Sequence, residues 1–167
     1  MITFKQFVEE KAAQLHELLN SKYEWPGLRH ESDSLYTTEF LDSEERVVVV
    51  NFSKWNGVWS VEFYRDGSFE MTGAGDAIKV FSTVLDIIKE FTESVDPDFI
   101  TFYAKSYEES RVKFYRRCAK KISSFGYKDI SDLSKKEVKE KYGAKVKLVI
   151  QSSGHQHFLL VRNDLAS

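Results

Sequence analysis

The sequence contains a single cysteine, Cys118, and has no long apolar run. A lone cysteine excludes an intrachain disulfide and is typical of proteins from a reducing compartment. A membrane-spanning helix needs ~20 apolar residues in succession, and no stretch comes close to that length. The first residues carry acids and lysines within their apolar pattern, which is not typical of a signal peptide. We therefore expect a cytoplasmic protein that does not bind a membrane.

The chain also has little net charge, −2 at pH 7. This balance gives no overall attraction to nucleic acid or to an anionic membrane, so any basic site must be local. Apolar residues make up 42% of the 167 residues and include 13 phenylalanines, which is enough for a continuous core. We expect one domain over residues 1–167, with an N-terminal helix over 1–25, a middle section over 35–104 and a C-terminal section over 105–167.

Local patterns in the first third of the chain predict a helix, a polar loop over residues 29–34, and then strands. Thr3 and Gln6 have the spacing of a capping box at the helix start. Short, turn-like separators between the strands favour an antiparallel meander. Residues 47–50 are uniformly apolar and β-branched, which predicts a central strand covered on both faces. The three expected strands cover residues 35–41, 46–52 and 58–65.

The rest of the chain begins with a long amphipathic helix over residues 76–91, whose apolar and polar residues fall on opposite halves of a helical wheel. The strand expected over 99–104 then lies parallel to the strand before the helix, through a right-handed crossover. Together the patterns predict an α/β fold, a mixed sheet with helices on both sides. The later elements are a helix over 107–123 opened by a Ser106/Glu109 capping box, a short helix opened by a Ser134/Glu137 box, and a hairpin of strands over 145–151 and 157–162.

Two glycines, Gly73 and Gly75, stand between the third strand and the long helix. A helix N-terminus presents unpaired backbone N–H groups and the positive end of the helix dipole, which suit a phosphate or another anion. The alternative is a tight strand-to-helix turn that needs the conformational freedom of glycine, with Asp76 as an ordinary acid of the first turn. These residues alone leave both interpretations open.

This order of elements and three local motifs resemble the GNAT acyltransferase superfamily. One of them is FGY at residues 125–127, where the family has Gly-Phe near the end of a helix. The EMTGAG run at residues 70–75 stands where the family has Gln/Arg-x-x-Gly-x-Gly/Ala, and EESRVKFY at residues 108–115 stands where it has Asn-x-x-Ala-x-x-Leu-Tyr. Glu70, Glu108 and Arg111 depart from these patterns. The resemblance covers roughly residues 35–162. The TGAGDAIKVF and SRVKFYRR runs are also similar to those of small phage-encoded proteins of this kind.

The resemblance implies acetyl-coenzyme A as cofactor, an amine as acceptor, and a role for each of several residues. Tyr115 would be the general acid that protonates the leaving thiolate, and Glu62 the base that takes a proton from the amine. Arg111, a charge on the inward stripe of its helix, could clamp an anion, pair with Glu108 or Glu62, or extend its charge to solvent. The cofactor's phosphates would lie on backbone N–H groups of Gly73, Ala74, Gly75, Asp76 and Ala77.

Each role has a simpler alternative: Tyr115 could be a core residue and Glu62 a solvated position on its strand. Cys118 is expected to be a core thiol, because no catalytic partners accompany it. His155 and His157 have no third ligand at recognisable spacing, so no metal site is expected.

The predicted function is transfer of an acetyl group from acetyl-coenzyme A to an amine. The alternative is a non-catalytic GNAT-like module that binds a protein or a nucleic acid. One helix face supports that alternative, since it could meet a polyanion, although solvated faces of this type are common. The face consists of Lys113, Arg116, Arg117, Lys120 and Lys121.

Overall fold

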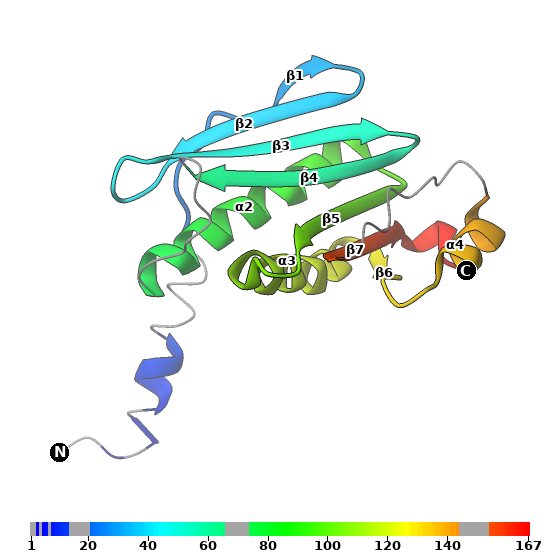
Figure 1. Ribbon diagram of the computed structural model, residues 1–167. Helices are drawn as coiled ribbons and strands as arrows, with labels where there is room; N and C mark the ends of the chain where they lie inside the picture. The colour runs from blue at the N-terminus through cyan, green and yellow to red at the C-terminus, as the bar shows by residue number, and fades with distance from the viewer. Residues whose placement is uncertain (1–2, 4, 7, 14–20, 66–73, 144–153) are drawn as a thin grey trace.

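The computed structural model describes residues 3, 5–6, 8–13, 21–65, 74–143 and 154–167. These residues form a seven-stranded sheet of order β1-β2-β3-β4-β5-β7-β6 with helices packed on it (Figure 1). Among the described residues, no helix is both long enough and apolar enough to cross a membrane. The elements are β1 (Arg29–Ser32), β2 (Leu35–Leu41), β3 (Val47–Trp55), β4 (Val58–Arg65), α2 (Ala74–Val95), β5 (Phe99–Lys105), α3 (Glu109–Ile122), the 3₁₀ turn η1 (Ser123–Phe125), β6 (Tyr127–Asp129), α4 (Lys135–Tyr142), β7 (His155–Arg162) and the 3₁₀ turn η2 (Asn163–Leu165).

Strands β2 to β4 form the predicted antiparallel meander, and β1 extends it at the edge of the sheet. The β3–β4 turn is the dipeptide Asn56-Gly57, with φ values of 48° and 79°. Positive φ at both central residues is typical of two-residue hairpins, because the twist of such a turn matches the twist of the flanking strands. Strand β3 is central, as predicted, but it is fully covered only on one face: Val48 and Val50 are buried, whereas Val47 and Val49 are half-buried.

Helix α2 lies along one face of the meander, as its divided pattern predicts (Figure 1). The helix is longer than expected, from Ala74 to Val95. Its inward residues Ile87, Ile88 and Phe91 are completely buried. The ring of Phe91 stacks on that of Phe52 in β3, with centroids 4.0 Å apart. Burial of such side chains contributes about 1.5–3 kcal/mol each, so this layer holds the helix to the meander.

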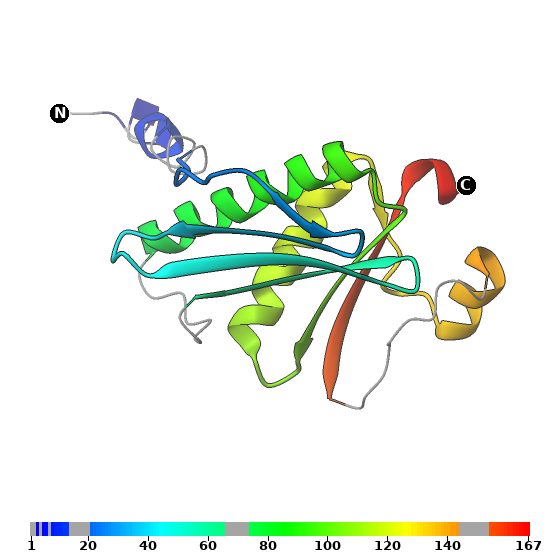
Figure 2. The ribbon, with the colours of Figure 1, turned by 90° about the horizontal axis from the view of Figure 1, so that it is seen from above.

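Strands β4 and β5 are parallel, as predicted, but they are paired over a short distance only. The paired residues are Trp59 with Ile100 and Ser60 with Thr101. Beyond them the two strands diverge (Figure 2). We call the opening between residues 61–65 of β4 and residues 102–105 of β5 the fork. It separates the meander from the other half of the sheet, in which β7 lies antiparallel between β5 and β6.

Helices cover both faces of the sheet, as the fold prediction requires. Helix α3 lies on the same face as α2, where its Tyr115 contacts the rings of Phe63 and Phe102. Helix α4 lies on the opposite face. There Val138 shares a separate apolar cluster with Val58, since residues at alternate positions of a strand point to opposite faces. The sheet is therefore a mixed α/β fold with the predicted order of meander, helix, parallel strand and helix.

Two strands were not predicted, β1 and β6. Residues 29–34 were expected to be a loop, which is wrong: Arg29–Ser32 pairs with β2. All four residues of β1 are exposed, so this edge strand has no apolar alternation that would predict it from the sequence. Strand β6 has only three residues. The expected strand over 145–151 lies outside the described residues.

The N-terminal capping box is confirmed: the Thr3 N–H donates to Gln6 Oε1 (2.8 Å) and the Gln6 N–H to Thr3 Oγ1 (3.2 Å). A helix that continues to residue 25 is wrong, because residues 21–28 have no regular structure. They run along α2 instead. The backbone N–H of Tyr23 donates to Thr83 Oγ1, so a tertiary hydrogen bond satisfies this group in place of a hydrogen bond within a helix.

The two later capping boxes differ in outcome. The Ser134/Glu137 box is present and opens α4. The box expected from Ser106 and Glu109 is wrong, because α3 begins at Glu109 and its N-cap residue, Glu108, makes no side-chain capping bond. The Glu108 carboxylate accepts from the backbone N–H of Lys105 instead (2.9 Å).

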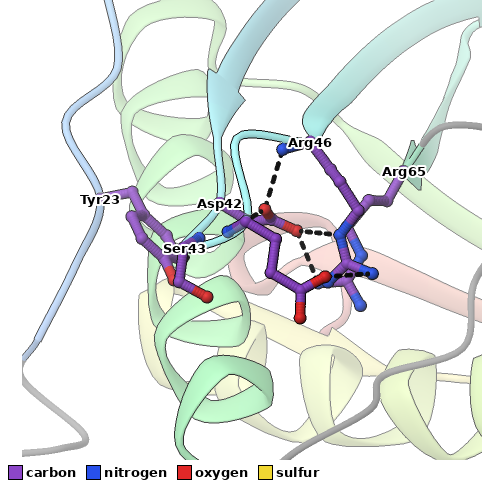
Figure 3. Close-up of polar contacts among 6 residues, drawn as sticks. Tyr23, Asp42, Ser43, Arg46 and Arg65 are labelled. Atoms are coloured by element: carbon purple, nitrogen blue, oxygen red, sulfur yellow. Dashed lines mark hydrogen bonds and ion pairs between the residues drawn. The ribbon is translucent and has the colours of Figure 1, made fainter.

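A buried carboxylate, that of Asp42, ties the β2–β3 turn to the end of β4 (Figure 3). Its side chain is 0% exposed, and it accepts from Arg46 Nε at 2.9 Å and Arg65 Nη1 at 3.0 Å. The backbone N–H groups of Glu44 and Arg46 also donate to it, each at 2.9 Å. Burial alone would raise the pKa of Asp42, but these hydrogen bonds outweigh it and hold the pKa below its usual value.

We expect Asp42→Asn to lower the free energy of unfolding by about 3–5 kcal/mol at pH 7, because the buried Arg65 guanidinium loses the Asp42 carboxylate. A carboxyl group with a lowered pKa stabilises the fold above its unfolded pKa, about 3.9, and loses that effect as pH falls through the folded value. The difference between wild type and variant should therefore shrink below about pH 4. Urea unfolding at pH 7 and pH 3 measures both quantities.

The matched control is Glu39→Gln on β2, whose carboxylate pairs with Arg29 at 3.8 Å while both side chains are half-exposed. Exposed pairs contribute at most about 1 kcal/mol. An equal effect from the two substitutions would contradict a special role for the Asp42 cluster.

Candidate functional site

The candidate site lies at the fork, where the side chains of Glu62 and Tyr103 meet across the diverging strands. Glu62 is two residues beyond the last paired residue of β4, and Tyr103 is two residues beyond the last paired residue of β5. The Tyr103 hydroxyl donates to Glu62 Oε1 at 2.7 Å. Tyr103 is 40% exposed, so this bond is accessible from solvent. The hydrogen bond to the carboxylate, together with partial burial, raises the pKa of Tyr103 to about 12.

Tyr115 approaches the fork from the helix side of the sheet. It is 1% exposed, with Phe63 and Phe102 packed against its ring. Burial raises the pKa of its hydroxyl, although a hydrogen bond from the backbone N–H of Phe63 opposes that effect. The charge of Glu62 also raises this pKa. The two predicted catalytic residues are therefore close, on opposite sides of β4, and the Tyr115 hydroxyl stays protonated at neutral pH.

Arg111 is the cation of this site. Its Nη1 atom lies 3.2 Å from Glu108 Oε1, which is one of the arrangements that the sequence left open. The charge of Arg111 lowers the pKa of both Tyr103 and Tyr115, so the guanidinium is within electrostatic reach of both hydroxyls. A cation there favours any negative charge that develops at the fork.

Two histidines extend the site along β7. His157 lies opposite Tyr103 in the antiparallel register, and their ring centroids are 6.0 Å apart at an interplanar angle of 27°. The ring of His155 lies 6.4 Å from that of Tyr103. Burial and the neighbouring His155 lower the pKa of His157, so it is neutral at pH 7. In the described part of the chain, no three histidine, cysteine or acidic side chains gather in a way that could hold a metal ion.

The predicted phosphate-binding loop is described only in part. Gly73 lies outside the described residues. Ala74 and Gly75 form the start of α2 rather than the end of a loop, so the predicted helix start at Asp76 is two residues too late; Asp76 and Ala77 follow in the helix. A role for these backbone N–H groups in binding phosphate remains a prediction.

Sequence reasoning missed Tyr103 because its importance depends on the register between β4 and β5. Tyr103 lies two positions from Thr101 and two from Lys105, so the three side chains share one face of the strand. Nothing local indicates that this face meets Glu62, 41 positions earlier. Cys118, in contrast, is a buried core thiol with a raised pKa, as expected.

We expect Glu62→Gln to lower the pKa of Tyr103 from about 12 towards its ordinary value near 10, because the neutral amide no longer stabilises the phenol against ionisation. With ¹³C-labelled tyrosine, the Cζ resonance of Tyr103 should stay at the phenol position at pH 10.5 in the wild type and shift towards phenolate in the variant. Tyr103→Phe assigns the signal. Glu39→Gln on β2 is the control, and an equal shift there would contradict a direct bond.

No family model matches the sequence, and no curated protein sequence matches it.

Several solved structures are similar to it overall. N-acetyltransferase PseH from Campylobacter jejuni is 14% identical and aligns with a TM-score of 0.46 over 95% of this chain and 82% of its own. Spermidine N-acetyltransferase from Vibrio cholerae, solved with CoA and spermine, is 8% identical with a TM-score of 0.44 over 100% and 80% of the two chains. Ribosomal-protein-S5-alanine acetyltransferase from Vibrio fischeri is 14% identical with a TM-score of 0.43 over 99% and 78%. All of these TM-scores lie below 0.5, and the function proposed below is based on the residues of the fork.

Proposed function

We propose that the protein is an acyltransferase that moves an acetyl group from acetyl-coenzyme A to an amine. The observation that carries this proposal is the fork, which brings an acid, two phenols and a guanidinium within reach of one another. A carboxylate and a phenol on opposite sides of one strand can remove a proton from one reactant and supply a proton to the other. Such a pair is what acyl transfer between a thioester and an amine requires.

The fork also fits an extended, amide-containing cofactor arm. The edge of β4 that faces β5 is not paired with it beyond Ser60 in these fully described strands. An extended chain can bind such an edge through backbone hydrogen bonds, as an added strand does. The first residues of α2, Ala74 and Gly75, stand at a helix N-terminus, which favours a diphosphate group. When bound, acetyl-coenzyme A supplies the activated acetyl group.

The residues at the fork have distinct roles in this proposal. Glu62 takes the proton that the amine loses as its nitrogen bonds to the acetyl carbon. Backbone N–H groups of β4 stabilise the negative charge on the carbonyl oxygen. Tyr115 donates its hydroxyl proton to the departing sulfur, and its raised pKa keeps that proton in place until then. Tyr103 holds the Glu62 carboxylate in place through its hydrogen bond, and the positive charge of Arg111 offsets the negative charge that Tyr115 gains when it loses its proton.

Binding of acetyl-coenzyme A is the first test. At ~100 times its dissociation constant a ligand adds ~2.7 kcal/mol to stability, so millimolar acetyl-coenzyme A should raise the melting temperature by several degrees. Gly75→Arg places a long side chain at the start of α2 and should abolish the shift. Glu90→Arg, on the exposed part of the same helix, adds the same side chain away from the site and should leave it unchanged.

No shift in the wild type, together with no binding by calorimetry, would overturn the acyltransferase proposal and favour the non-catalytic alternative. A shift that survives Gly75→Arg would show that the cofactor binds elsewhere.

The second test is kinetic, with release of free thiol from acetyl-coenzyme A measured across a panel of primary amines. We expect Tyr115→Phe and Glu62→Gln each to lower kcat by ~10²-fold or more, the usual contribution of a positioned acid or base. Tyr127→Phe is the matched control, since its buried hydroxyl bonds the Pro97 carbonyl away from the fork. Equal loss in all three variants would indicate a general structural effect.

A further inference from the structure

From residue 113 to residue 121 the outer face of α3 carries only positive charge, and the exposed acid Glu109 lies one turn earlier in the helix. Between residues 113 and 121, five side chains are exposed and all five are cations, whereas the other four are buried in the core. We call this surface the basic face of α3. The exposed residues are Lys113, Arg116, Arg117, Lys120 and Lys121, and the buried ones are Phe114, Tyr115, Cys118 and Ala119.

The basic face differs from other arginines of the protein in its contacts with carboxylates. Arg162 contacts three carboxylates, those of Asp96, Asp98 and Asp164. Arg65 contacts Asp42. No ion pair joins any residue of the basic face to a carboxylate in the part of the chain that the structure describes. The chain has 26 acids against 24 lysines and arginines, so this separation of charge is not a result of a shortage of acids.

The make-up of the face indicates what kind of partner it suits. Stable protein interfaces and membrane-bound helices need apolar or aromatic anchors, and this face offers none. Proteins that bind single-stranded nucleic acid stack bases on aromatic side chains, which are also absent from the face. A surface of flexible cations alone matches a regular array of phosphates, whose recognition is electrostatic and independent of sequence.

We propose that the basic face of α3 binds the phosphate backbone of a nucleic-acid duplex, without sequence preference. The five cations follow one another at intervals of three and one residues over about 12 Å of helix. They occupy two adjacent rows, so three to five of them can reach phosphates of one duplex together. The buried side of the same helix carries Tyr115, so duplex binding and the chemistry proposed at the fork use opposite sides of α3.

The test is fluorescence anisotropy of the full chain with a labelled 20-base-pair DNA duplex of mixed sequence, and with an RNA duplex, from 50 to 300 mM salt. Neutralising three to five phosphates predicts a slope of log affinity against log salt of about −3 to −4.5 for DNA. Arg117→Gln combined with Lys121→Gln should reduce the slope by about two, because each lost phosphate contact reduces it by about one.

The control removes the same charge from α4 through Lys136→Gln and Lys139→Gln, two exposed lysines on a helix that also carries acids. These changes should leave the slope unchanged. Melting temperatures confirm that the variants are folded. If the Arg117→Gln, Lys121→Gln double variant does not fold, the single variant Arg116→Gln removes one charge from the same face.

Three results would overturn the proposal. The first is no binding of either duplex at 50 mM salt, and the second is an equal loss of slope in the α3 and α4 variants. The third is tighter binding of single-stranded DNA, of poly-glutamate or of anionic lipid vesicles than of a duplex. None of these results bears on acetyl-coenzyme A binding, so this proposal and the acyltransferase proposal can fail separately.

Discussion

Two residue pairs join the two halves of the sheet, Trp59 with Ile100 and Ser60 with Thr101. Such short pairing cannot hold the strands in place, because each backbone hydrogen bond contributes only about 1 kcal/mol net. The helices hold them instead. Tyr115 packs against Phe63 of β4 and Phe102 of β5, so its ring bridges the strands where backbone pairing has stopped. The fork exists because side-chain packing beneath it replaces hydrogen bonding within it.

This replacement also explains the electrostatics of the site. Diverging strands leave space for the Tyr103 hydroxyl to reach the Glu62 carboxylate, which continuous pairing would fill with backbone. The same opening lets the charge of Glu62 act on Tyr115 from the other side of β4. The low effective dielectric constant around the buried Tyr115 hydroxyl makes these electrostatic interactions stronger than they would be in water. The raised pKa of Tyr103 thus follows mainly from its hydrogen bond to Glu62, whereas the pKa of Tyr115 is raised mainly by burial and in addition by the charge of Glu62.

Sequence patterns predicted the elements whose residues carry their own signal. The divided pattern of residues 76–91 predicted a helix with one buried face, and α2 has that face, with Ile87, Ile88 and Phe91 buried. Elements defined by their neighbours were missed, such as exposed β1 and the irregular segment around Tyr23. Of the residues at the fork, Glu62, Tyr115 and Arg111 were named from the sequence, and their roles stay predictions. Tyr103 was missed, because its contact with Glu62 requires a strand register that no local pattern encodes.

The burial of Cys118 gives the protein a built-in reporter of motion. It is the sole thiol in the chain, it is completely buried, and α3 holds it against the sheet. A thiol reagent can reach it only when that helix separates from the strands beneath. When the reagent reacts slowly compared with reclosing, the labelling rate therefore measures the fraction of molecules in which the packing that sustains the fork is open, without any engineered probe.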